Sequence, residues 1–291
     1  MSGELVKELM DPATTLDALL RVPISTSDLE KNRLAPKERR DAMNNLLLAY
    51  EHVPAASRIC YFDIRPFPGT AERRDLVIEP QAKSTNFKSG LVFKTAKRLP
   101  SLFYLPYRKN GTTRMKLDQP DDWAGGEVKF FATAAIDGCS VYIEGPAHTP
   151  KVTHANAANV QPTLATDTYA QKQPKILAKS QAMDARVQFV RKTAVTVVER
   201  PDYMVEAPAQ VHAAKQQFAL RKGIPIVQVQ SYMPFGAVMG VKSGGLWTFY
   251  MQKSGAFQYT PALGGDVLDG YMVLGAREVY PNGGGAVRII P

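Results

Sequence analysis

Short β-type runs dominate the chain from residue 56 onward, and they constrain the fold more than any other feature. Between residues 56 and 143 the runs RICYFDI, DLVIE, GLVFK, SLFYLPY and EVKFFATAAI are rich in Val, Ile, Phe and Tyr and are separated by Pro, Gly, Asn and Asp. The first group of residues favours strands and the second favours turns. Strands do not alternate regularly with helices, which argues against a parallel doubly wound sheet. The sequence predicts an α+β fold, with a β-sandwich-like core of mixed or antiparallel sheets flanked by helices.

The chain divides into a helical beginning and a longer β-rich part. Residues 1–55 are expected to be a helical N-terminal segment, because Pro36 can open a helix and apolar residues follow it at spacings of three and four. Residues 56–291 are expected to form the β-rich catalytic domain. Within it, residues 160–175 are polar, contain two prolines and predict a loop or a sub-boundary.

The C-terminal half combines two expected helices with further strands. One helix is predicted around residues 181–192 and another over residues 209–222, the latter ended by Gly223. Four strands follow, with SGG and KSG as turn signals, and a last hairpin is predicted around residues 282–285. The four strand candidates are IVQVQSYM, AVMGVK, LWTFYMQ and AFQYT.

The length of the apolar runs and the number of cysteines bear on membrane insertion, secretion and disulfide formation. No run of eighteen apolar residues occurs, and the first twenty residues mix acids into their apolar positions, so neither a membrane span nor a Sec-type signal peptide is expected. Two cysteines, Cys60 and Cys139, are too few for a disulfide framework. A reduced protein is the expectation, and a single bridge between the two is the alternative.

The net charge of +9 is concentrated in one segment. Residues 83–117 hold nine Lys or Arg and no acid, with five aromatic residues interleaved. This pattern favours an acidic partner surface, which is either a protein or the phosphates and bases of a nucleic acid. The structural alternative places the aromatic side chains on the core face of strands and the basic ones on the solvent face.

The stretch DGCSVYIEGPAHTPKVTHANA, residues 137–157, carries the candidate chemistry. Cys139 follows Gly138 at the start of SVYI, and KVTH returns after a Gly-Pro turn, so a β-hairpin is predicted. That hairpin brings Cys139 near His154, where facing Cβ atoms lie about 5 Å apart. A nearby imidazole lowers the pKa of a thiol and shuttles its proton, which suits nucleophilic catalysis. Gly138 leaves room for a substrate carbonyl, and the amides of Gly138 and Cys139 are candidates for an oxyanion hole.

The remaining histidines and the other cysteine carry weaker signals. His148 lies in the predicted turn, and His52 and His212 have no motif around them. Cys60 sits in an apolar strand and is expected in the core. Free cysteine is among the most buried residue types, so Cys139 also has a packing interpretation. The spacing of the cysteines and histidines matches no zinc site.

The Gly138-Cys139 pair, with His154 fifteen residues after the cysteine, resembles the thiol glutamine deamidase toxins, the group of cytotoxic necrotizing factor and Burkholderia lethal factor. About twenty residues carry the likeness, and Ile-Asp stands before the glycine where better-known members have Leu-Ser. The resemblance implies a β-sandwich flanked by helices and a thiolate that hydrolyses the side-chain amide of one glutamine in a host protein. It also implies a third group that orients the histidine, for which Thr133 is the candidate. The thiol mechanism that the resemblance implies requires no metal or organic cofactor.

The same resemblance implies a biological setting. The protein is expected to be a bacterial toxin or effector, made in the bacterial cytoplasm, secreted without a Sec-type signal peptide and active in the host cytosol. A small GTPase of the Rho type or a translation initiation factor is the expected substrate. Conversion of Gln to Glu adds a negative charge and removes two hydrogen-bond donors, which disables a catalytic glutamine.

Two other functions are compatible with the sequence. A cysteine protease or a transglutaminase uses the same Cys-His pair and differs only in the amide attacked or in the acceptor. A non-enzymatic β-rich protein that binds nucleic acid or protein through residues 83–117 leaves Cys139 in the core. The residues alone do not separate these alternatives.

Overall fold

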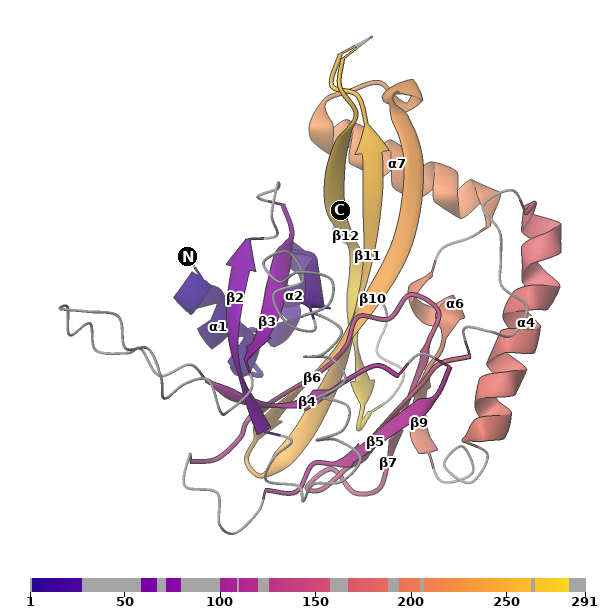
Figure 1. The fold of residues 1–291 in the computed structure, drawn as a ribbon. Coiled ribbons are helices and arrows are strands. Elements are labelled where there is room, and N and C mark those ends of the chain that lie inside the picture. The colour runs from indigo at the N-terminus through magenta and orange to yellow at the C-terminus, as the bar shows by residue number, and fades with distance from the viewer. Residues whose placement is uncertain are drawn as a thin grey trace, which may run out of the picture.

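Two β-sheets with a shared apolar interior form the centre of the molecule (Figure 1). The computed structural model describes residues 2–27, 59–66, 72–79, 100–108, 110–119, 126–157, 167–187, 194–204, 207–262 and 265–282. Within these ranges the larger sheet has eight strands and the smaller one has four.

The larger sheet is mixed. Its strand order is β1-β3-β2-β4-β6-β10-β11-β12, with parallel pairing between β1 and β3 and between β4 and β6 and antiparallel pairing elsewhere. The strands are β1 (Ile24–Ser27), β2 (Ile59–Pro66), β3 (Arg74–Glu79), β4 (Ser101–Leu105), β6 (Phe130–Thr133), β10 (Val229–Ser243), β11 (Leu246–Tyr259) and β12 (Leu268–Tyr280).

The smaller sheet is antiparallel throughout, in the order β5-β8-β7-β9. Its strands are β5 (Thr112–Lys116), β7 (Ser140–Glu144), β8 (Lys151–Ala155) and β9 (Ala194–Val198). Strand β7 is buried along its whole length, as a central strand covered on both faces must be.

The main core lies between the two sheets. Phe131 and Phe249 of the larger sheet belong to one cluster of buried side chains with Val141, Ile143 and Val152 of the smaller sheet. Two sheets whose inner faces share one core are the arrangement of a sandwich. The predicted α+β fold with a sandwich-like core is confirmed.

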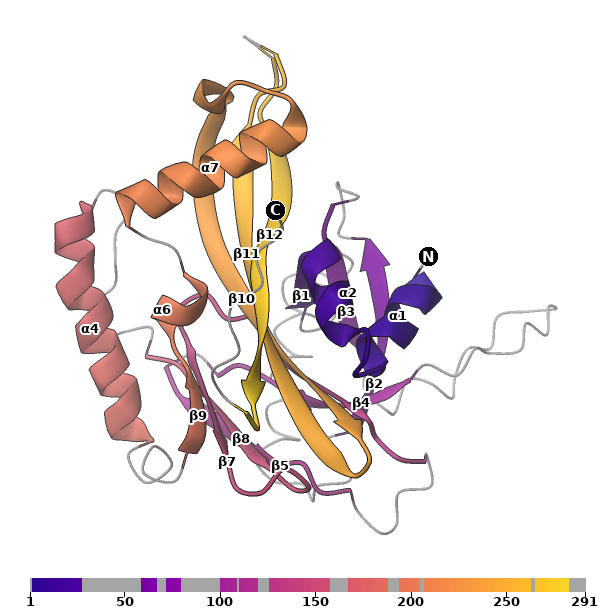
Figure 2. The ribbon, with the colours of Figure 1, turned by 180° about the vertical axis from the view of Figure 1, so that it is seen from behind.

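Helices pack against both sheets (Figures 1 and 2). Helices α1 (Ser2–Met10) and α2 (Thr15–Arg21) share a buried cluster with β2, β4 and β6 of the larger sheet. Helix α4 (Tyr169–Arg186) packs on the smaller sheet, where Met183 contacts the cluster of Tyr142 and Ala155. Helix α7 (Pro208–Lys222) lies across the long strands β10–β12, with Phe218 stacked on Phe257 at 4.2 Å between ring centroids.

The N-terminal segment contributes a strand as well as helices. Residues 24–27 form β1, which pairs in parallel with β3, although the sequence predicts a helical segment. A four-residue strand whose partner lies far along the chain leaves no periodic signal. The helix predicted after Pro36 lies outside the described residues, and the division at residue 55 stays a prediction.

Helix α4 begins earlier than the sequence predicts. Residues 160–175 are predicted as a loop and the helix only around residues 181–192, whereas α4 runs from Tyr169 to Arg186. The loop prediction is wrong for residues 169–175, because Pro174 does not end the helix but lies inside it.

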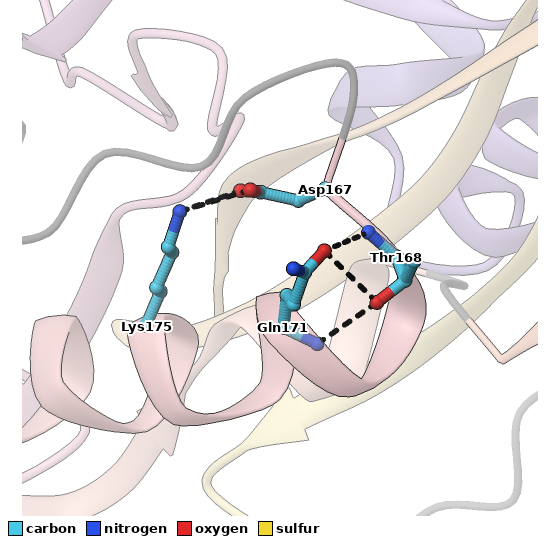
Figure 3. A network of polar contacts seen from close by, with 4 residues as sticks. All are labelled: Asp167, Thr168, Gln171 and Lys175. Atoms are coloured by element: carbon cyan, nitrogen blue, oxygen red, sulfur yellow. Dashed lines mark hydrogen bonds and ion pairs between the residues drawn. The ribbon is translucent and has the colours of Figure 1, made fainter.

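A capping box determines where α4 starts (Figure 3). Thr168 Oγ1 accepts the backbone N–H of Gln171 at 3.4 Å, and Gln171 Oε1 accepts the backbone N–H of Thr168 at 2.8 Å. Lys175 then reaches back to the Asp167 carboxylate at 2.8 Å. The two hydrogen bonds between Thr168 and Gln171 satisfy backbone N–H groups that the start of a helix leaves open.

Two long strands replace the four short ones predicted near the C-terminus. SGG does form the turn between β10 and β11, but KSG lies inside β11. A methyl group at Gly255 would lie 2.7 Å from the Tyr232 ring and 2.8 Å from the Phe257 ring. Glycine is used there to admit packed aromatic rings, not to turn the chain.

The remaining secondary-structure predictions are confirmed in some places and missed or untested in others. The helix over residues 209–222 is confirmed, and Gly223 caps it with φ +65°. Strand β5 is not predicted, although its alternation of exposed and buried residues has the period of a strand. The run GLVFK and the far arm of the hairpin at residues 282–285 lie outside the described residues. In the part of the chain that the structure describes, no helix is long and apolar enough to cross a membrane.

Candidate active site around Cys139

The β7–β8 hairpin places Cys139 and His154 on the same face of the smaller sheet. The predicted hairpin is confirmed, with Val141 opposite His154 and Ser140 opposite Ala155. Cys139 immediately precedes Ser140, so it shares a face with Val141 and therefore with His154. That face points into the core between the sheets, where Cys139 and Val141 are both 0% exposed. His154 is thus a diagonal neighbour of Cys139.

Asn156 is the direct polar partner of the thiol. Its Nδ2 donates to Cys139 Sγ at 3.1 Å, from the position that extends the β7–β8 register by one residue. Burial raises the pKa of Cys139 to about 11, and the Asn156 hydrogen bond opposes this effect. The Asp137 carboxylate raises the pKa further, whereas the Lys179 ammonium and a backbone hydrogen bond of Asp137 lower it.

The His154 imidazole is buried and neutral. It is 1% exposed, and among the described residues neither ring nitrogen has a hydrogen-bond partner. Its ring centroid lies 6.1 Å from that of Tyr107. Burial lowers the pKa of His154 to about 4. Proton transfer from a thiol at about 11 to an imidazole at about 4 costs roughly 10 kcal/mol, so the pair is un-ionised in this closed arrangement.

Tyr203, in the short helix α6 (Arg200–Tyr203), holds the backbone beside the thiol. The Gly138 N–H donates to Tyr203 Oη at 2.8 Å, and Tyr203 Oη donates to the Cys139 carbonyl at 2.8 Å. Gly138 has φ +132°, a conformation that side chains rarely permit. The Gly138 amide, one of the two candidates for an oxyanion hole, is therefore directed at Tyr203. The role of these amides in catalysis stays a prediction.

Two cations lie over Gly138. A methyl group added there would lie 3.0 Å from Lys179 Nζ of α4 and 3.5 Å from an Arg200 guanidinium nitrogen of α6. Burial lowers the pKa of Lys179, and the nearby Arg200 lowers it further, whereas Cys139 and Asp137 act in the opposite direction. The cations favour negative charge at the thiol or at a group bound beside it.

Thr133 lies on the other sheet. It ends β6, is 0% exposed and donates its hydroxyl to the Ala134 carbonyl at 2.8 Å. No hydrogen bond joins it to His154 among the described residues. Its assignment as the group that orients the histidine stays a prediction.

The other cysteine and the other described histidines lie away from the Cys139 site. Cys60 lies in β2 within the cluster under α1 and α2. His148 is exposed in the β7–β8 turn and His212 is exposed on α7. His52 lies outside the described residues. No group of three or more His, Cys, Asp and Glu able to hold a metal ion occurs in the ranges that the structure describes.

Residues 100–108 and 110–117 of the basic segment lie within the described structure. Phe103 and Tyr104 are buried in β4, as the packing alternative for residues 83–117 predicts. Arg114 and Lys116 of β5 line a hollow of about 430 Å³ together with Lys151 and Glu144. Arg114 forms an ion pair with Glu144 there.

Sequence reasoning missed Asn156, Tyr203, Lys179 and Arg200. The first had a signal, because a residue two positions after His154 shares its face of the strand. The other three come from α4 and α6, and nothing local to the hairpin indicates them.

No family model matches the sequence, and no curated protein matches it. Among solved structures, the chain is similar to the C-terminal domain of CNFy from Yersinia pseudotuberculosis, with 10% sequence identity and a TM-score of 0.27. The similarity covers 62% of this chain and 62% of the length of that one. At that TM-score the likeness carries no argument about fold or activity.

Proposed function

We propose that this protein is a cysteine-dependent protein-glutamine deamidase, a hydrolase that acts as a bacterial toxin or effector on a host protein. The observation that carries the proposal is the juxtaposition of Cys139 and His154 on one face of the β7–β8 hairpin, beside a glycine with positive φ. A buried imidazole with no hydrogen-bond partner in the described structure lowers the stability of the folded state. Such groups are concentrated at functional sites, which supports a chemical role for His154.

The proposed chemistry uses the thiol and the imidazole in two steps. Cys139 Sγ forms a bond to the carboxamide carbon of the substrate glutamine while its proton passes to His154. The imidazolium gives that proton to the departing ammonia, and a thioester remains. Water, deprotonated by the same imidazole, attacks the thioester, and the thiol leaves with the proton. The balance is glutamine and water in, glutamate and ammonia out.

This chemistry requires the site to open. The thiol is fully buried, and roughly 10 kcal/mol separates the neutral pair from the ion pair. Entry of a hydrated polar side chain reduces the desolvation that produces both pKa shifts. Substrate docking is accordingly part of the proposal. The basic segment is the proposed docking surface for an acidic host protein such as a small GTPase or a translation factor, with action in the host cytosol after export from the bacterium.

The test is mass spectrometry of purified Rho-type GTPase and translation initiation factor incubated with the protein. A glutamine converted to glutamate gains about 1 Da, whereas a protease gives fragments and a transglutaminase gives an adduct with an added amine. Cys139→Ser and His154→Gln are expected to abolish the conversion, and the matched variant Cys60→Ser is expected to retain it. Conversion that survives Cys139→Ser contradicts the proposal.

A second candidate is a non-enzymatic binding protein in which Cys139 is a core residue. The complete burial of the thiol and its raised pKa favour this candidate. Alkylation of Cys139 by iodoacetamide in the presence of the candidate host protein, read by peptide mass spectrometry, separates the two in a Cys60→Ser background. Fast alkylation near neutral pH that is lost in His154→Ala supports the enzyme, and slow alkylation indifferent to His154 supports the binding protein.

A further inference from the structure

Asn156 is held beside the thiol by hydrogen bonds of both its backbone and its side chain. Its backbone N–H donates to the Gly111 carbonyl at 2.9 Å, and its Oδ1 accepts the backbone N–H of Asn110 at 2.9 Å. Because the oxygen of the carboxamide is occupied by Asn110, the orientation of the group is determined, and Nδ2 must face Cys139. The side chain is 4% exposed.

The turn that holds Asn156 is itself specialised. Asn110 has φ +56°, a left-handed conformation that is uncommon outside glycine. This turn leads into β5, which pairs with β8. The hydrogen bond to Sγ is therefore built from two segments of the smaller sheet and is not a chance contact of a surface side chain.

We propose that Asn156 is a catalytic residue of this site, whose carboxamide donates a hydrogen bond to Cys139 Sγ and stabilises the thiolate that attacks the substrate. An N–H donor to sulfur favours the charged form over the neutral thiol. The catalytic part of this inference rests on the proposed deamidase function, whereas the effect on the thiol does not.

The other charged and titratable groups near the thiol do not replace Asn156. Lys179 and Arg200 lie over Gly138 from the helical side. The Asp137 carboxylate opposes ionisation of the thiol, and the backbone hydrogen bond of Asp137 favours it less than the Asn156 side chain does. His154 faces the same core but forms no hydrogen bond to Cys139 Sγ in the described structure. The Tyr203 hydroxyl is hydrogen-bonded to the backbone of Gly138 and Cys139. Asn156 is the described side chain with a hydrogen bond to Sγ.

The test is a titration of thiolate ultraviolet absorbance in a Cys60→Ser background, after subtraction of the same titration of the Cys60→Ser/Cys139→Ser protein, which removes the absorbance of the twelve ionising tyrosines. Asn156→Asp keeps an oxygen for the Asn110 N–H and loses the donor to sulfur, and Asn156→Leu loses the donor without adding charge. Both are expected to raise the midpoint of the thiol titration by about one pH unit, a tenfold smaller thiolate fraction below the midpoint. Asn110→Asp, which adds a carboxylate nearby without touching sulfur, is expected to change the midpoint less.

A second measurement needs no variant at Asn156. In the Cys60→Ser protein, the side-chain amide NMR signal of Asn156 is expected to shift with the same midpoint as the thiolate absorbance. An unchanged midpoint in the Asn156 variants, or an amide signal indifferent to the titration, would overturn the inference. Absence of deamidation with a shifted midpoint removes only the catalytic part, so the two proposals fail separately.

Discussion

The two cysteines of this chain lie in regions that differ in chemistry although they share burial. Cys60 is 5% exposed and Cys139 is 0% exposed, and burial raises their pKa values to about 12 and about 11. Around Cys60 the cluster beneath α1 and α2 is apolar, with Phe62 and Leu102 among its members. Around Cys139 an amide, a phenol and an ammonium group converge.

The comparison teaches that burial does not identify a working thiol. Both cysteines are buried, and desolvation is the dominant cause of both pKa shifts. What differs is the polar surroundings, which are expensive to bury and are kept only where hydrogen bonds or a function compensate. If the Cys139 region carries that cost, substitutions there will change stability and thiol ionisation differently from substitutions elsewhere in the chain.

Tyr203→Phe is expected to lower the free energy of unfolding by about 3 kcal/mol, because the Gly138 N–H and the Cys139 carbonyl both lose a buried partner. Urea denaturation measures the change. Tyr280→Phe is the matched control, since its hydroxyl donates a single hydrogen bond to the Gly145 carbonyl, and about 1 kcal/mol is expected there. Equal losses in the two variants would contradict the role of Tyr203.

Acid is expected to destabilise the protein through His154. The pKa of His154 is lowered from 6.5 to about 4 in the folded state, so the unfolded state binds more protons between these values. The free energy of unfolding therefore falls as the pH is lowered from 6.5 to about 4, by as much as about 3 kcal/mol. Urea titrations across this range measure the slope. His154→Leu is expected to flatten it, and an unchanged slope in that variant would show that the imidazole is not buried neutral.

Serine substitution is expected to separate the two thiol regions. Cys60→Ser places a hydroxyl in an apolar cluster and is expected to cost about 2 kcal/mol. Cys139→Ser is expected to cost about 1 kcal/mol less, because Asn156 Nδ2 can donate to the new oxygen. Thermal or urea unfolding of both variants checks the order, and a larger loss at Cys139 would reverse the comparison.

The smallest expected effect is that of Lys179→Met. Loss of the ammonium group removes a charge that lowers the pKa of Cys139, so the midpoint of the thiolate absorbance is expected to rise by a few tenths of a pH unit. Lys175→Met is the control on the same helix, because Lys175 pairs with Asp167. A shift that is equal in both variants would indicate a general charge effect and not a contact at the thiol.

Much of the fold was open to prediction from local pattern. The β-rich runs that lie within the described residues, the hairpin that carries Cys139 and His154, and the helix over residues 209–222 are confirmed, because each leaves a periodic or turn signal in one continuous stretch of sequence. The start of α4 was missed because Pro174 outweighed the capping box of Thr168 and Gln171. The length of β11 was missed because Gly255 makes room for packed aromatic rings inside the strand and does not form a turn.

Local sequence pattern was enough to predict that the chain is α+β, that its hairpin presents a cysteine and a histidine on one strand pair, and that two cysteines make no disulfide framework. Strand periodicity and turn residues are local, so they can be read from neighbouring positions. The contact of Sγ with Asn156, the hydrogen bonds of Tyr203 to the backbone at Gly138, and the position of Lys179 over that glycine follow from long-range packing. Those groups come from separate segments, and the side-chain environment that determines a pKa is set by packing across the whole chain.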